Sequence, residues 1–151
     1  EHKGFMHMKL PFKDALCEAP DRPGADAPLR ARTAMLPPRE REVVEASLFR
    51  NQSVRRIAQL RGLTPRAVRY RLNRGMRRMR SERFRQTMRA RTFLSPDDAR
   101  LAALRFCQAV PIARLARREG VSLHAMRRRL DRIAAQISLL SDGVAGRRRA
   151  S

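Results

Sequence analysis

Arginine is the side chain through which this sequence could do most of its chemistry. Of its 35 cationic residues 32 are arginine, acidic residues number 14, and the formal net charge is +21. The guanidinium group is a planar fork of donors that can grip a phosphate or a guanine edge with two hydrogen bonds. The charge excess therefore predicts a polyanionic partner, with nucleic acid as the first candidate. The preference for Arg over Lys fits this chemistry, and it fits the codon usage of a GC-rich genome equally well.

Several of these arginines share one face of an expected helix. Arg66, Arg69, Tyr70, Asn73 and Arg77 follow the spacing i, i+3, i+4, i+7 and i+11. Arginine can bind guanine, asparagine can bind adenine, and tyrosine can pack or donate. Val68, Leu72, Met76 and Met79 line another face and are expected in the core. The residues predicted to contact DNA are Thr64, Pro65, Arg66, Arg69, Tyr70, Asn73, Arg74 and Arg77, with His124, Arg127 and Arg128 in a later, equivalent stretch. Arg74, with Arg71 and Arg78, lies on a flank where phosphates are expected.

Other kinds of chemistry find little support in the sequence. Cys17, Cys107 and the three histidines are scattered, so we expect neither a disulfide framework nor a metal site. There is no Gly-rich phosphate loop and no nucleophile–base constellation, so we expect no cofactor and no enzymatic activity. No long apolar run and no secretory signal occurs. We therefore expect no membrane partner and a cytoplasmic, nucleoid-associated protein.

An internal repeat supplies the elements that would position these residues. Sliding the chain along itself until Leu36 falls on Leu94, a shift that we call the repeat offset, superposes ten identical pairs without a gap. The pairs include Pro38 with Pro96 and Gly62 with Gly120, which similarity between two arginine-rich helices would not keep in register. We interpret the chain as two copies of one structural unit.

Each copy has the pattern of a helix-turn-helix. A helix start at Pro37-Pro38 or Ser95-Pro96 is followed by short helices expected at 53–60 and about 112–118. A glycine turn comes next, and Thr64 or Ser122 then caps a third helix. The apolar positions expected to lock the helices together are Ile57, Ala58, Leu63, Val68 and Leu72 in the first copy and Leu115, Ala116, Val121, Met126 and Leu130 in the second.

The sequence thus predicts an all-α fold with two tandem three-helix units. We expect a flexible N-terminal segment over 1–35, with a net charge of only +1. A first helix-turn-helix domain with a basic connector follows over 36–92, with 17 cations and 4 anions. The second domain is expected over 93–140 and a flexible basic tail over 141–151. Gly75 is unfavourable inside a helix, yet the third helix is expected to run on towards residue 90 as the connector.

The first copy resembles region four of bacterial sigma factors and, more loosely, LuxR-type DNA-binding domains. The resemblance rests on residues 36–44, 53–58 and 62–72, covers about 36–80, and extends more weakly to 94–137. It implies a third helix in the major groove, base-facing residues at Pro65, Arg66, Arg69 and Tyr70, and a contact with RNA polymerase. The chain departs from the family at Arg55 and Arg56, where the family usually has an acid. The promoter-melting part of a sigma factor is missing, so we expect a duplicated DNA-reading module.

Three functions fit these observations. The first is a sequence-specific transcription regulator that binds double-stranded DNA and RNA polymerase. The second is a DNA-recognition subunit of a phage packaging or recombination machine, and the third is a protein that binds and inhibits polymerase. The first copy, with the higher charge, is expected to supply most of the DNA affinity. The oligomeric state stays open.

Overall fold

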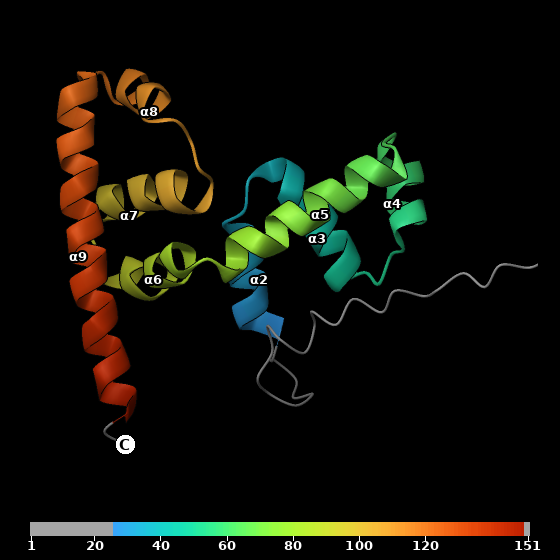
Figure 1. Ribbon diagram of the computed structural model, residues 1–151, viewed down its shortest axis with the longest axis horizontal. Coiled ribbons are helices and arrows are strands. Elements are labelled where there is room, and N and C mark those ends of the chain that lie inside the picture. Colours follow the sequence, from blue (N-terminus) through green and yellow to red (C-terminus); the bar gives the residue numbers. More distant parts are fainter. Residues whose placement is uncertain (1–25, 150–151) are drawn as a thin grey trace, which may run out of the picture.

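The computed structural model describes residues 26–149, and within this range the chain forms helices and connecting turns without any strand (Figure 1). The first unit contains α2 (Asp26–Ala34), α3 (Pro38–Leu48), α4 (Val54–Arg61) and α5 (Pro65–Arg80). The second contains α6 (Glu82–Ala90), the short η1 (Arg91–Phe93), α7 (Pro96–Ala102), the π-helical turn η2 (Ala103–Cys107), α8 (Ile112–Glu119) and α9 (Leu123–Arg149). The expected all-α fold is confirmed, and the order of the helices is consistent with a helix-turn-helix fold. None of these helices is long and apolar enough to cross a membrane.

The core of the first unit lies between α3, α4 and α5. Val68, Leu72, Met76 and Met79 of α5 are buried as the sequence predicted, and they pack with Val43, Val44 and Ile57. Gly75 lies on the same buried face, directly against α3. Gly75, although unfavourable by its helix propensity, therefore stands where α3 lies too close to α5 for a Cβ atom.

The second unit repeats the backbone of the first at the repeat offset found in the sequence. The left-handed residues Asn51 and Gly62, with φ of 50° and 63°, correspond to Ala109 and Gly120, with φ of 53° and 66°. At the repeat offset, Val54 and Arg61 at the ends of α4 correspond to Ile112 and Glu119 at the ends of α8. Pro65 at the start of α5 likewise corresponds to Leu123 at the start of α9. Gly62 and Gly120 both end their helices in the left-handed conformation, as expected for glycine after the last turn.

The expected flexible segment of residues 1–35 differs from the structure at its C-terminal end. Residues 26–34 form α2, where Pro28 falls in the first turn, so its missing N–H breaks no helical hydrogen bond. Leu29 and Thr33 are buried, and the Arg30 guanidinium stacks 4.1 Å from the ring centroid of Phe49. Helix α2 is thus packed against α3, while residues 1–25 lie outside the described part of the chain.

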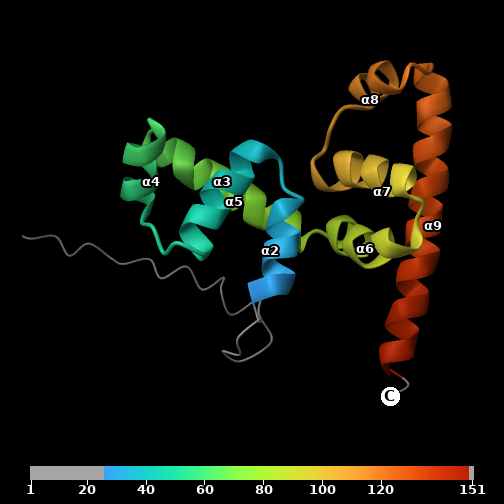
Figure 2. The ribbon, with the colours of Figure 1, turned by 180° about the vertical axis from the view of Figure 1, so that it is seen from behind.

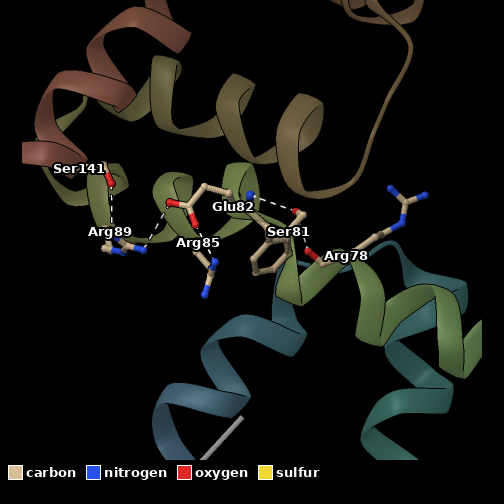
Figure 3. A network of polar contacts seen from close by, with 7 residues as sticks. Arg78, Ser81, Glu82, Arg85, Arg89 and Ser141 are labelled. Atoms are coloured by element: carbon tan, nitrogen blue, oxygen red, sulfur yellow. Dashed lines mark hydrogen bonds and ion pairs between the residues drawn. The ribbon is translucent and has the colours of Figure 1, made fainter. Parts of the chain in front are cut away.

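The connection between the units also differs from the expected continuous helix. Helix α5 ends at Arg80, and Ser81 adopts an extended conformation with its Oγ accepting from the backbone N–H of Phe84 (Figure 3). The following helix, α6, packs against α9 and η2, so most of the expected connector belongs to the second unit (Figures 1 and 2). Phe84 nevertheless reaches the core of the first unit, while Ala90 lies in that of the second.

Helix α9 is longer than expected and occupies part of the predicted tail. It buries Ile133, Ile137 and Ser141, and the Arg89 guanidinium donates to Ser141 Oγ at 3.3 Å (Figure 3). Because these contacts hold the helix as far as residue 141, it continues into the segment predicted as flexible, up to Arg149. Of the expected locking residues in this unit, Val121 is instead 42% exposed, because it stands in the turn after Gly120.

Candidate nucleic-acid interface

Helices α4 and α5 form a helix-turn-helix, which we call the first head (residues 54–80). Ser53 Oγ accepts from the N–H of Arg56 and Thr64 Oγ1 accepts from the N–H of Ala67, so both helices are capped. The N–H of Leu63 closes the turn by donating to the carbonyl of Ala58 at 3.0 Å. These local bonds and the buried Ile57, Ala58, Val68 and Leu72 fix one face of α5 inward. The opposite face is therefore presented to solvent.

The predicted reading face of α5 lies on that solvent side. Arg66, Arg69, Tyr70, Asn73 and Arg77 are all exposed, as are Thr64 and Pro65 at the start of the helix. Within the described residues, no acidic side chain pairs with Arg66, Arg69 or Arg77. Their guanidinium groups are therefore available to an external anion. Thr64 differs from the others, because its hydroxyl is used as the helix cap.

The flank of α5 is bound to an acid that the sequence analysis did not single out. Glu40 of α3 is 8% exposed, and its Oε1 lies 3.4 Å from Arg74 Nε and 3.7 Å from Arg78 Nε. Arg74 Nη1 also donates to the Tyr70 hydroxyl at 2.9 Å. Arg74 and Arg78 thus help to attach α5 to α3, and Arg74 orients Tyr70. Glu40 precedes the buried Val43 and Val44 of α3 by three and four residues, and this helical spacing was the sequence signal for its burial.

A hollow of about 580 Å³ opens beside the C-terminal half of the reading face. It is lined by Tyr70, Asn73, Arg74, Arg77, Arg78, Ser81 and Phe106. Phe106 comes from η2 of the second unit, and the Arg83 guanidinium stands 5.3 Å from its ring centroid. The second unit therefore borders the reading face of the first. This neighbourhood was not foreseeable, because it depends on how the two units pack.

Helices α8 and α9 form the second head (residues 112–138), where Ser122 Oγ caps α9 by accepting from the N–H of Ala125. His124, Arg127 and Arg128 are exposed, as predicted for a contact surface. Arg129 is turned instead to Asp98 of α7, with Nη2 3.1 Å from Oδ1. The N-terminal ends of α5 and α9 lie far apart, at opposite ends of the molecule (Figures 1 and 2). The structure thus keeps the two predicted contact surfaces separate.

In each unit, one ion pair joins the first helix of the helix-turn-helix to the helix that precedes it, and its polarity is opposite in the two units. Arg61 Nη1 lies 3.1 Å from Glu42 Oε2 in the first unit. At the equivalent positions of the second unit, Arg100 Nη2 lies 2.9 Å from Glu119 Oε1. The contact is kept while acid and base exchange places. Both units therefore hold their short helix against the preceding helix in the same way.

Comparison with protein families supports the resemblance for the first unit. Residues 27–79 match the model of sigma-70 region 4, and this range runs from α2 to α5. The match includes α2, which the sequence analysis had left outside the domain. No curated protein and no solved structure matches the chain.

Proposed function

We propose that the protein is a sequence-specific regulator that binds double-stranded DNA through its helix-turn-helix heads. The observation that carries this proposal is the exposed face of α5, inside a segment matching sigma-70 region 4. Arg66 and Arg69 lie in its first two turns and form no ion pair with the residues that the structure describes. In helix-turn-helix proteins the N-terminal residues of the second helix contact base edges in the major groove. Arg66 and Arg69 stand at this position and can each bind guanine O6 and N7.

The remaining cations supply affinity rather than sequence preference. Arg77 and the other exposed arginines face solvent, where they can contact DNA phosphates. Neutralising phosphates releases counterions from the DNA, so binding should weaken steeply as the salt concentration rises. Thr64 and Pro65 shape the start of α5, because Thr64 Oγ1 accepts from the N–H of Ala67 and proline suits the first helical position. We therefore assign base recognition to the start of α5 and positioning to its flanks.

We propose further that the two units arose by duplication and that both contact DNA. The shared register of caps, left-handed residues and the bridging ion pair supports a common origin. The second head carries His124, Arg127 and Arg128 at positions equivalent to the reading face of the first. The first head, in the more basic segment, supplies most of the affinity.

RNA polymerase is the proposed second partner of the first unit. The support is the match to region 4 of sigma-70 factors, a region that binds both DNA and polymerase. Exposed Arg55 and Arg56 on α4 give this surface a basic character. As a DNA-bound regulator the protein acts in the cytoplasm, at the nucleoid, and we assign it no enzymatic activity and no cofactor.

Selection from a random duplex pool, followed by footprinting of the enriched sequence, tests the DNA-reading function. The Arg66→Ala/Arg69→Ala double variant is expected to lose sequence preference, because each bidentate contact contributes about 1–3 kcal/mol of discrimination. The control is Arg39→Ala/Arg50→Ala, which removes two exposed charges outside α5 and should lower affinity without changing the motif. The absence of any enriched sequence with the unmodified protein would refute sequence-specific binding.

A further inference from the structure

The reading faces of the two heads differ in chemistry although their backbones correspond. Four positions on α5 match four on α9 at the repeat offset, and all eight side chains are exposed. Only one position is identical: the pairs are Arg66 with His124, Arg69 with Arg127, Tyr70 with Arg128, and Asn73 with Asp131. A duplicated reader with the same side chains would read a repeated sequence, whereas these two faces would not.

Asp131 is the most informative of these differences, because its carboxylate stabilises no other group in the part of the chain that the structure describes. Most acidic groups packed near the core are paired: Glu40, Asp98 and Glu119 each lie within 4.0 Å of an arginine nitrogen. Asp131 forms no ion pair within the described residues, although Arg127 and Arg128 stand one helical turn before it. The fold therefore leaves a carboxylate free on an otherwise basic, solvent-facing surface.

A carboxylate that faces duplex DNA can be accommodated only at a hydrogen-bond donor. Phosphates repel it, and guanine and thymine present acceptors to the major groove. Cytosine presents its N4 amino group there, while adenine combines a donor with the N7 acceptor. Cytosine is therefore the base whose edge best matches an aspartate, as adenine is the base that best matches an asparagine.

We propose that Asp131 of the second head accepts a hydrogen bond from cytosine N4, whereas Asn73 of the first head binds adenine, so that one chain reads two unlike half-sites. This inference rests on the proposed DNA-binding function. A bipartite site with unlike halves has a direction, so a single chain would be oriented on the duplex. It would need no second copy to distinguish the two ends of its site.

Reciprocal substitutions in the full chain test the proposal. Sequences selected by Asp131→Asn should exchange cytosine for adenine at one position in one half-site, with about fivefold or greater change in preference. Asn73→Asp should produce the opposite exchange in the other half-site. The control is Asp142→Asn, which removes the same charge from an exposed position on the same helix. This control should leave the selected motif unchanged.

The possible outcomes separate this proposal from the proposed function. If Asp131→Asn raises affinity for all sequences while selecting the unmodified motif, the carboxylate only repels phosphate and the proposal is wrong. Two identical half-sites selected by the unmodified protein would also overturn it, and DNA reading itself would stand in both cases. If the unmodified protein enriches no sequence, the DNA-reading function fails instead. Circular dichroism of each variant verifies that these exposed substitutions leave the helical fold intact.

Discussion

Replacing Gly75 by alanine should destabilise the protein, although alanine is the better helix former. A Cβ atom at residue 75 would lie 2.7 Å from Val44 Cγ2 and 3.3 Å from Glu40 Cβ. Carbon atoms pack best at about 3.5–4.0 Å, so the first contact is a steric overlap. Valine is restricted to essentially one rotamer in a helix, and a Cβ atom moves only with its backbone. The clash can therefore be relieved only by separating α5 from α3.

The magnitude follows from two opposing terms. Exchanging glycine for alanine inside a helix stabilises it by about 1 kcal/mol. Overpacking a close-packed core costs about 1–3 kcal/mol, and the stiff neighbours of Gly75 place this site in the upper half of that range. The free energy of unfolding should therefore fall by about 1–2 kcal/mol. For a chain of this size the corresponding decrease in Tm is roughly 2–8 °C.

Thermal and urea unfolding, followed by far-ultraviolet circular dichroism, measures this change. Gly143→Ala is the matched control, because Gly143 lies in α9 with no atom within 4 Å of an added Cβ, and it should raise stability. In a double-mutant cycle, Val44→Ala should make Gly75→Ala less costly, since it removes the clashing methyl group. The reasoning is refuted if Gly75→Ala stabilises the protein as Gly143→Ala does.

Two further predictions concern buried polar groups. Glu40→Ala should lower the free energy of unfolding by roughly 1–3 kcal/mol, because it leaves the buried Nε of Arg78 without its ionic partner; unchanged urea unfolding would contradict this. Burial raises the pKa of the Cys107 thiol to about 12, so its thiolate is almost absent at neutral pH. In a Cys17→Ser variant, Cys107 should resist iodoacetamide until the protein is unfolded, as followed by mass spectrometry; rapid labelling of the native protein would show that the site is open.

Local signals in the sequence were sufficient to predict the helix-turn-helix geometry. Thr64 and Ser122 cap their helices, and Gly62 and Gly120 end theirs, because each of these features depends on residues that are close neighbours along the chain. The exposed face of α5 followed from helical periodicity. Stacking of Arg30 on Phe49, by contrast, joins two helices across a turn, so the packing of α2 could not be predicted from local patterns.

In the candidate site, the partners of Arg74 and Arg78 likewise could not be predicted from local sequence patterns. Their spacing on α5 indicated a phosphate-binding flank, but Glu40 is distant from both in the sequence and becomes their neighbour only when α3 packs against α5. The sequence pattern predicts which face a side chain occupies. It does not predict which side chains of other helices pack beside that face. The presence or absence of an acidic neighbour there determines whether an arginine is available to an external anion.

The helix between the units determines whether the two heads can act independently. Phe84 and Ala90 lie towards opposite ends of α6, are each fully buried, and belong to the cores of different units. A hinge motion at Ser81 would have to expose Phe84, and exposing a buried phenylalanine costs about 1.5–3 kcal/mol. This cost favours a single relative orientation of the two heads. DNA resists bending, and a smooth bend of a binding site costs of order 1–6 kcal/mol. A duplex that engages both heads must therefore match their separation or bend at that energetic cost. In the proposed complex, the spacing between half-sites is consequently specified by the packing of α6, not by the residues proposed to contact bases.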